Sequence, residues 1–195
     1  MQPDTRSRAR SMMRRELADA AFEVLAERGY NAVTVEELVR AIGTSRATFF
    51  RYFDAKEDVV LMTAAPDERD IAAVVAAAEV PVDDQTDAVF RILGETLPPV
   101  GEQTKRLRAR VLMITANPAL GARLAGRRGA RQAEFAAALS GSSASPADAQ
   151  VYAAIAFACL DVAWRSWARD DSSDLQLYYD DAVQRARTLM GRQEK

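Results

Sequence analysis

Residues 34–56, TVEELVRAIGTSRATFFRYFDAK, constrain the fold more than any other part of the chain. Thr34 and Glu37 have the spacing of a capping box, in which each side chain bonds the other residue's backbone N–H. A helix is therefore predicted to begin near residue 35. Gly43 follows at a position where a helix can end, because glycine adopts a left-handed backbone conformation at little energetic cost. Between them, one buried helix face is predicted from the three- and four-residue spacing of Leu38, Val39 and Ile42.

A second short helix is predicted directly after this turn. Ser45 is a residue type that caps helix N-termini, and Arg46, Ala47 and Thr48 would form the first turn. Phe49 and Phe53 are four residues apart, so both are expected to lie on one inward face. Two short helices joined by a turn that contains glycine predict a helix-turn-helix unit.

In such a unit the second helix enters the DNA major groove with its N-terminal residues against base edges. Arg46 could donate to guanine, Thr48 could bond a base or a phosphate, and Ala47 allows close approach to a thymine methyl. The alternative is an ordinary pair of amphipathic surface helices. Because both caps, the turn and the polar first turn agree, we favour DNA binding.

Residues 43–57 resemble the hallmark of the tetracycline-repressor family of bacterial regulators, a glycine, a capping serine, a threonine, aromatic residues and a Lys-Glu pair. The resemblance extends back over residues 20–34, which look like the family's first helix and the approach to its second. It covers about the first third of the chain. It implies an all-α fold, with an N-terminal three-helix DNA-binding domain followed by a larger helical ligand-binding and dimerisation domain.

The same resemblance implies phosphate contacts at the positions of Phe50, Tyr52 and Lys56, although Phe50 lacks the hydroxyl that the family's usual tyrosine offers. Glu36 occupies a position from which some members contact a base, but a carboxylate repels phosphate, so we expect Glu36 to be solvated. The full set of residues predicted to contact DNA is Thr34, Ser45, Arg46, Ala47, Thr48, Phe50, Tyr52 and Lys56.

The first fifteen residues carry five arginines against one aspartate, a charge that suits phosphates or a minor groove. The alternative is a solvated, disordered terminus. The formal net charge of the whole chain is −2, which disfavours indiscriminate coating of nucleic acid. The five arginines are Arg6, Arg8, Arg10, Arg14 and Arg15.

An enzyme gains little support from the composition. The chain has no histidine, so histidine acid-base catalysis and histidine metal ligation are excluded. The single Cys159 cannot form an internal disulfide, and its apolar neighbours predict a buried thiol. Acidic pairs such as Asp170 and Asp171 stand where helix caps and solvated charge are expected. No catalytic residue, metal site or cofactor is predicted.

Beyond Lys56 the sequence has no clear alternating strand pattern, and its Ala, Leu, Arg and Glu content predicts helices. We assign residues 1–56 to the DNA-binding domain with its arm, and residues 57–195 to the ligand-binding and dimerisation domain. Ser145 and Pro146 begin a long helix whose buried face is expected to contain Val151, Ile155, Cys159 and Val162. The predicted helices after Lys56 are 56–65, 66–79, 84–97, 101–116, 118–139, 146–170 and 175–190.

The last two helices are expected to form the interface of a homodimer, because family members commonly dimerise there, and intrachain core is the alternative. A two-fold dimer matches two half-sites of a palindromic operator about 34–36 Å apart. Arg108 and Arg110 are interpreted as a solvated helix face, with contact to an anionic ligand as the alternative. Apolar side chains predicted to line an effector pocket are Phe90, Leu93, Leu97, Leu112, Met113, Phe157, Trp164 and Trp167.

The segment ARVLMITANPALGARL is also similar to regulators of the mycofactocin system in actinobacteria. We therefore expect a cytoplasmic, sequence-specific regulator of transcription, a repressor released from double-stranded DNA by a small apolar or amphipathic effector. Neither a secretory signal nor a run of about 18 uninterrupted apolar residues is found, so no membrane partner is expected. The alternatives are a helical adaptor whose helix-turn-helix is unused and, with less support, an enzyme that needs no histidine.

Overall fold

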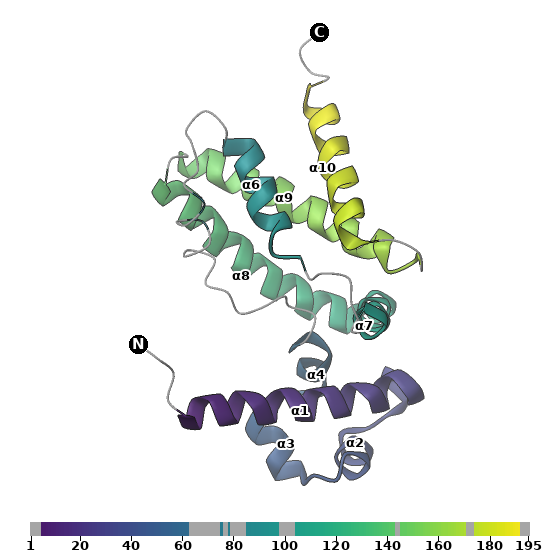
Figure 1. The fold of residues 1–195 in the computed structure, drawn as a ribbon. Coiled ribbons are helices and arrows are strands. Elements are labelled where there is room, and N and C mark those ends of the chain that lie inside the picture. The colour runs from purple at the N-terminus through teal and green to yellow at the C-terminus, as the bar shows by residue number, and fades with distance from the viewer. Residues whose placement is uncertain are drawn as a thin grey trace.

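The computed structural model describes residues 5–62, 75, 78, 85–97, 104–142, 145–170 and 174–191. Within these ranges the chain is helical and contains no strand, as predicted. Figure 1 shows a lower unit built from the N-terminal helices and an upper unit built from the later ones. The predicted helix 66–79 lies outside the described residues except at positions 75 and 78.

The N-terminal unit begins with a long helix, α1 (Thr5–Arg28), which crosses the whole unit in Figure 1. Gly29 ends α1 with φ of 90°, a backbone conformation that suits glycine, and the short 3₁₀ helix η1 (Tyr30–Ala32) follows. The helices α2 (Val35–Ala41), α3 (Arg46–Tyr52) and α4 (Lys56–Met62) complete the unit. Both α2 and α4 pack against α1.

Apolar burial in the N-terminal unit reaches past the predicted domain boundary at residue 56. Phe22 and Leu25 of α1 pack with Phe49 of α3 and with the run 59–61 of α4, all nearly inaccessible to solvent. Two residues of the later helices join the same core, Ile114 and Leu120. The N-terminal unit is therefore packed directly against part of the C-terminal unit.

The C-terminal unit consists of α6 (Gln85–Gly94), α7 (Thr104–Ala116), α8 (Pro118–Ser142), α9 (Pro146–Trp167) and α10 (Leu175–Gly191). The beginnings of α8, α9 and α10 were predicted correctly. Ser145 caps α9 by accepting a hydrogen bond from the N–H of Asp148 at 3.2 Å, as its sequence predicts. The central helix is α9, which packs against α6, α7, α8 and α10.

The predicted buried face of α9 is partly wrong. Val151 is 55% exposed and Val162 is 47% exposed. The buried face consists mainly of small residues, which let α8 and α10 approach the axis of α9 closely, and of Trp164 and Trp167 near its end. The small buried residues are Ala149, Ala153, Ala156, Cys159 and Ala163.

Cys159 is 5% exposed, as predicted, and lies between α9 and α10. Its thiol donates to the carbonyl oxygen of Ala182 at 3.6 Å. Burial raises the pKa of the Cys159 thiol. The thiol therefore stays protonated and packed inside the C-terminal core.

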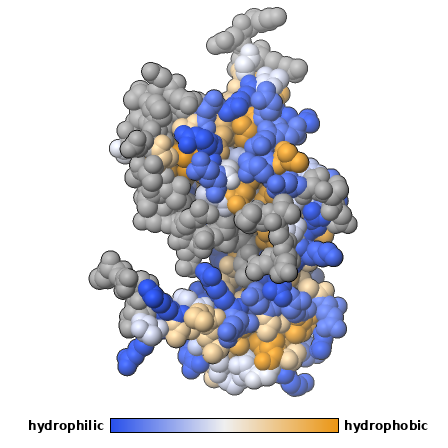
Figure 2. Space-filling view, viewed as in Figure 1, coloured by the Kyte–Doolittle hydropathy of each residue, from blue (hydrophilic) through white to orange (hydrophobic). Residues whose placement is uncertain are grey.

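By length and composition, α9 is the one helix among the described residues that could cross a membrane. Its buried side chains pack against neighbouring helices of the same chain, as in the central helix of a helical bundle. Figure 2 shows hydrophilic residues interspersed with hydrophobic ones over both units on the face in view. This packing agrees with a core helix rather than a membrane span.

Candidate nucleic-acid interface

The helices α2 and α3 begin with the caps that the sequence predicts. Thr34 Oγ1 accepts from the N–H of Glu37 at 3.2 Å, and Glu37 Oε2 accepts from the N–H of Thr34 at 2.9 Å. Ser45 Oγ accepts from the N–H of Thr48 at 3.0 Å. Gly43 has φ of 66°, the left-handed conformation expected after the first helix. The helix-turn-helix geometry is therefore determined by local hydrogen bonds.

The inward face of α3 anchors this pair of helices to the core. Phe49 is fully buried and Phe53 is 1% exposed, and their ring centroids lie 5.0 Å apart. Phe50, the next residue after Phe49, points outward and is 41% exposed. The predictions for Phe49 and Phe53 as core residues are confirmed, and the opposite face of α3 is open to solvent.

Arg46 lies in the first turn of α3 and its side chain is 65% exposed. Its Nη1 donates to Oε1 of Glu36 on α2 at 2.5 Å, and its guanidinium lies 5.5 Å from the centroid of the Phe50 ring. Glu36 is thus paired with Arg46, and its side chain is 54% exposed, so it is solvated as predicted. Phe50 has no hydroxyl to bond a phosphate, but the face of its ring attracts the cation of Arg46.

Other predicted contact residues also lie on the open side of the pair. Ala47 is exposed and Thr48 is half-buried, with Thr48 Oγ1 accepting from the hydroxyl of Ser45 at 3.0 Å. Tyr52 is half-buried, and the guanidinium of Arg51 lies 5.1 Å from its ring. The hydroxyls of Thr34 and Ser45 bond within their own caps, so their main role in this structure is to begin the helices.

Lys56 is turned toward the protein. Its Nζ donates to the carbonyl oxygens of Tyr30 and Val33, both at 2.7 Å, and lies 4.2 Å from the centroid of the Tyr30 ring. Burial lowers the pKa of Lys56. The ammonium therefore has a structural role at the approach to α2, where the sequence predicted a phosphate contact.

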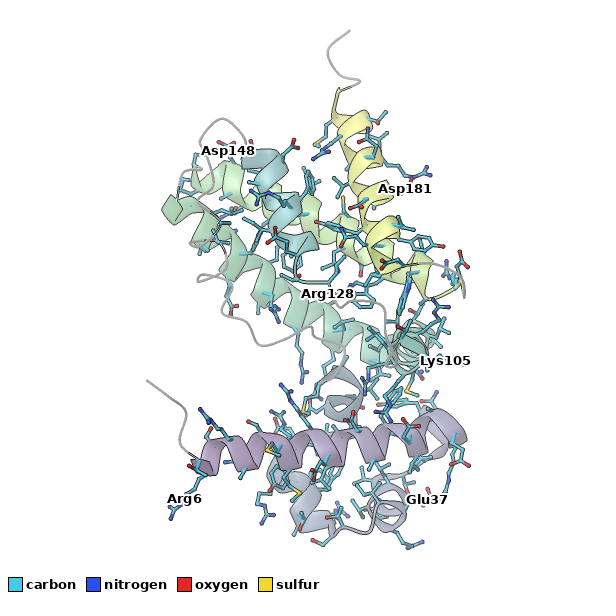
Figure 3. All side chains as sticks on the ribbon, viewed as in Figure 1. Arg6, Glu37, Lys105, Arg128, Asp148 and Asp181 are labelled. Atoms are coloured by element: carbon cyan, nitrogen blue, oxygen red, sulfur yellow. The ribbon has the colours of Figure 1, made fainter. Side chains whose placement is uncertain are left out.

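We expect Lys56→Met to lower the free energy of unfolding by about 1–2 kcal/mol, because two carbonyl groups lose their charged donor while the apolar stem is kept. Denaturant unfolding of the variant measures this loss. Lys105→Met, at an exposed position of α7 labelled in Figure 3, is the matched control. Equal stability of the two variants would contradict the structural role of Lys56.

Glu57, the next residue, links the same region to α8. Its Oε1 accepts from the hydroxyl of Tyr30 at 2.6 Å, and its Oε2 lies 3.9 Å from Nη1 of Arg123. Burial alone would raise the pKa of Glu57, but the hydrogen bond from Tyr30 and the charge of Arg123 outweigh it and hold the pKa below its ordinary value. Burial, followed by the bond to Glu57, raises the pKa of Tyr30. The carboxylate is thus favoured in the folded protein.

A carboxyl group with a lowered pKa contributes stability above its unfolded pKa of about 4.3, and this contribution disappears as pH falls through the folded pKa. In Glu57→Gln we therefore expect a shallower loss of unfolding free energy between about pH 5 and pH 3. Denaturant titrations across this range measure the slope. Tyr30→Phe, which removes the hydroxyl donor, should show part of the same change, and a wild-type slope in Glu57→Gln would count against this assignment.

Asp58 is a buried charged residue that the sequence analysis missed. It is 2% exposed and accepts hydrogen bonds from the N–H groups of Asp54 and Ala55. Two arginines of α8 also pair with it, Arg127 at 2.6 Å and Arg123 at 3.3 Å. The position of Asp58 in the first turn before an apolar run signals a helix N-terminus, but its arginine partners are more than sixty residues away in the sequence.

Arg108 and Arg110 of α7 are buried, so the interpretation of these two residues as a solvated helix face is wrong. The guanidinium of Arg108 lies 4.7 Å from the ring of Trp167, and that of Arg110 lies 4.1 Å from the ring of Phe22. Burial lowers the pKa of Arg110 to about 10, so the group remains charged at neutral pH. Each arginine covers an aromatic ring at a helix interface.

A cavity of about 550 Å³ lies between α7, α8 and α9. This volume is within the range of about 300–1,000 Å³ that small-molecule sites occupy. Phe157 and Trp164, two of the residues predicted for an effector pocket, line it together with Val111, Ile114 and Leu124. Its charged groups are Arg128, Asp161 and Arg165, in which the carboxylate of Asp161 pairs with both guanidinium groups. Figure 3 labels Arg128 on α8.

The other predicted pocket residues lie elsewhere. Leu93 and Trp167 belong to the C-terminal core, Leu97 packs at its edge, and Met113 packs against the N-terminal core. Leu112 is 44% exposed. Phe90 also belongs to the C-terminal core and borders a separate hollow of about 510 Å³ between α6 and α10.

Basic residues extend along α1, where the sequence predicted an arm or a disordered terminus. The helix begins at Thr5, so the described arginines of this segment are helical. Arg10 Nη2 donates to the carbonyl oxygen of Arg51 in α3 at 3.4 Å, and the guanidinium of Arg14 lies 5.8 Å from the Phe53 ring. Figure 3 shows Arg6 at one end of the N-terminal unit and Glu37 toward the other.

Three helices with an exposed, capped second helix of a helix-turn-helix define a class of nucleic-acid-binding domains. Residues 17–62 match the sequence model of the family described as "Bacterial regulatory proteins, tetR family". A TetR-family transcriptional regulator from Mesorhizobium loti has a similar fold, with a TM-score of 0.50 and 17% sequence identity over 92% of this chain and 97% of that chain. The N-terminal unit is therefore a DNA-binding domain of the TetR family.

Curated relatives agree with this family. The HTH-type transcriptional repressor AcnR of Corynebacterium diphtheriae is 39% identical over 66 residues, which are 34% of this chain and 35% of AcnR. The HTH-type transcriptional regulator TcmR of Streptomyces glaucescens is 36% identical over 95 residues, 47% of this chain and 42% of TcmR. The alignments thus span well under half of these relatives. The family and these relatives are regulators rather than enzymes.

A mycofactocin biosynthesis transcriptional regulator, MftR of Mycobacterium tuberculosis, is 36% identical over 52 residues, which are 27% of this chain and 26% of MftR. Among the described residues, no group of three or more acidic, cysteine or histidine side chains is placed to hold a metal ion.

Proposed function

We propose that this protein binds double-stranded DNA in a sequence-specific manner through α2 and α3 and regulates transcription, acting as a repressor. The observation that carries the proposal is the open face of α3, where Arg46, Ala47 and Thr48 form the first turn while Phe49 holds the helix to the core. Helix-turn-helix proteins place this turn against base edges. The relatives named above are transcriptional regulators and repressors, which supports the same function.

Arg46 is the residue that we assign to base recognition, with Thr48 and Ala47 beside it. Its planar guanidinium suits the O6 and N7 atoms of guanine. Tyr52 and the helical arginines of α1 are assigned to the DNA backbone, because they flank α3 and because phosphate contacts determine position rather than sequence. Thr34 and Ser45 support this face by capping α2 and α3, and Lys56 supports it through the carbonyl oxygens to which it donates. The ring of Phe50 supports Arg46.

We propose a homodimer that pairs exposed apolar side chains of α9 and α10. Large apolar side chains on the surface often mark an interaction site, and a two-fold dimer would present two copies of α3 to a palindromic operator. The division of labour would then follow the sequence, with residues 1–56 supplying DNA contacts and residues 57–195 supplying dimerisation and effector binding. The exposed apolar residues are Val151, Val162, Leu177, Leu189 and Met190.

The cavity between α7, α8 and α9 is our candidate for the effector site. Its wall is mostly apolar and includes the charged cluster of Arg128, Asp161 and Arg165, so a small apolar or amphipathic molecule is the expected class of effector. Binding of the effector would release DNA, and the protein would act in the cytoplasm. This function needs no metal or cofactor.

The function is tested by selecting bound duplexes from a fragmented genome of the host. The affinity of the protein for the selected duplex and for a scrambled duplex is then measured by titration at two salt concentrations. A regulator should select a palindrome, bind it at least about a thousandfold more tightly than the scrambled duplex, and lose affinity as salt rises. Weak and equal binding to both duplexes would overturn the proposal and favour a helical adaptor protein.

A further inference from the structure

The carboxylate of Asp58 bonds two parts of the chain at once. Its Oδ2 accepts from the backbone N–H groups of Asp54 at 3.0 Å and Ala55 at 3.1 Å, the two residues that follow the C-cap of α3. Its Oδ1 lies 2.6 Å from Nη2 of Arg127 and 3.3 Å from Nη2 of Arg123, both on α8. One buried carboxylate therefore joins the end of α3 to the side of α8.

A second contact joins the same two units near the start of α2. Asn31 in η1 donates from Nδ2 to Oδ1 of Asn117 at 2.9 Å. Asn117 stands between α7 and α8, and its own Nδ2 donates to the carbonyl oxygen of Met113 at 2.7 Å. The start of α8 thus contacts the helix pair α2–α3 both before α2 and after α3.

The candidate effector cavity borders the same part of α8. Leu124 and Arg128 line the cavity, and they are the direct neighbours in sequence of Arg123 and Arg127. Asn117 lines it as well. A shift of the first turns of α8 caused by a molecule in the cavity would therefore also move the partners of Asp58.

We propose that Asp58 is a positioning residue that sets the orientation of α3 relative to α8, and that occupancy of the cavity lowers DNA affinity by changing the pairs between Asp58 and Arg123 and Arg127. This inference rests on the proposed function. The effect of an occupied cavity would then reach α3 through α8 and the cluster of Asp58, Arg123 and Arg127, which we call the polar joint. This route exists in addition to the covalent connection of the two units through α4.

The chemistry of the joint makes it sensitive to small movements. A buried carboxylate depends on its cationic and hydrogen-bonding partners, because an unpaired charge in a low-dielectric interior is costly. Apolar contacts tolerate sliding, whereas hydrogen bonds weaken steeply with distance and angle. A displacement of α8 that apolar packing would absorb can therefore break the pairs with Asp58. The N–H groups of Asp54 and Ala55 would report this change directly.

The first test removes the arginines and leaves the carboxylate in place. In the full-length double variant Arg123→Ala/Arg127→Ala, we expect faster hydrogen exchange at the amides of Asp54 and Ala55, and at least a tenfold loss of affinity for the selected duplex. Arg131→Ala removes a positive charge from the same helix, at a position that is not a partner of Asp58, and is the matched control.

The outcomes separate this inference from the function on which it rests. If the wild-type protein does not distinguish the selected duplex from the scrambled one, the proposed function fails before any variant is compared. Unchanged amide exchange in the double variant overturns the joint, and faster exchange without a loss of affinity overturns its role in orienting α3. A loss of affinity in Arg131→Ala equal to half that of the double variant would assign the effect to charge alone.

The second test fills the cavity from α9, so that no effector needs to be known. Ala158 lines the cavity, and Ala158→Phe should lower affinity for the selected duplex at least fivefold, the lower end of common allosteric couplings. In the Arg123→Ala/Arg127→Ala background the same substitution should change affinity less than twofold. Equal losses in both backgrounds, or no loss in the wild-type background, would overturn transmission through Asp58.

Ala137→Phe adds the same ring at an exposed position of α8 that does not line the cavity, and serves as the matched control. Its duplex affinity should equal that of the wild type. A loss equal to that of Ala158→Phe would overturn the role of the cavity. Light scattering on both variants reports the oligomeric state alongside the affinities.

Discussion

Phe49→Ala is expected to unfold the N-terminal unit at much lower denaturant concentration than the wild type, with a loss of about 3–5 kcal/mol in free energy of unfolding. The ring is fully buried, packs 5.0 Å from Phe53, and holds α3 against α1 and α4. Its removal leaves a cavity that the capped helices cannot close without losing their contacts. Circular dichroism during denaturant titration measures the loss, and specific duplex binding should disappear with it.

Phe50→Ala is the matched control for this prediction. Phe50 is the next residue in the same helix, and 41% of its surface is exposed. Truncation there leaves no internal cavity, so we expect a change in unfolding free energy of less than about 1 kcal/mol. If both alanine variants lost stability equally, the inward and outward faces of α3 would have to be reassigned.

Arg46→Ala is expected to reduce the preference for the selected duplex over a single-base variant of its half-site by about 10- to 100-fold, which corresponds to about 1–3 kcal/mol. The guanidinium stands in the first turn of α3, with Glu36 on one side and the ring of Phe50 under it, so it is oriented before DNA arrives. Affinity for the scrambled duplex should fall much less. Competition titrations with a set of single-base variants measure both quantities.

The control is Arg40→Ala, which removes the same charge from α2 outside the first turn of α3. Its effect should be weak and similar on all duplexes, because a charge without a base contact affects affinity but not sequence preference. A loss of equal size on every duplex for Arg46→Ala would remove Arg46 from base recognition.

The helix-turn-helix could be predicted from sequence because its determinants are local. The two caps are formed by Thr34 with Glu37 and by Ser45 with Thr48, each pair three residues apart. The turn depends on the backbone conformation of Gly43 alone. Each cap and the turn can therefore be recognised in a short stretch of sequence. The buried faces of α2 and α3 followed from helical spacing for the same reason. The start of α9 at Ser145 and Pro146 was predictable in the same way.

Contacts between distant segments could not be predicted. The partners of Asp58 lie on α8, and the pairing of Glu36 with Arg46 depends on how α2 and α3 cross. Lys56 was predicted to contact phosphate because of the family resemblance, but in the structure its ammonium donates to two backbone carbonyl oxygens. A charged side chain has many possible partners in the sequence, and the packing of distant segments determines which partner lies within bonding distance.

The buried face of α9 was mispredicted because an alanine-rich helix gives an ambiguous pattern. Valine is more apolar than alanine, which favoured Val151 and Val162 as core, yet close packing of α8 and α10 needs the small residues inward. Most of the residues predicted for an effector pocket do not line the cavity between α7, α8 and α9, for a related reason. Large side chains such as Trp167 fill space in the core, and a cavity forms where smaller residues leave room.

The burial of Cys159 makes the protein convenient for spectroscopy. The chain has one cysteine, and its thiol is shielded between α9 and α10 with its pKa raised by burial. The thiolate, not the thiol, attacks thiol reagents, so the native residue should react slowly in the folded protein. A fluorophore or spin label can therefore be attached to a cysteine introduced on the surface of α3, and the distance between the two recognition helices of a dimer can be followed without first replacing the native residue.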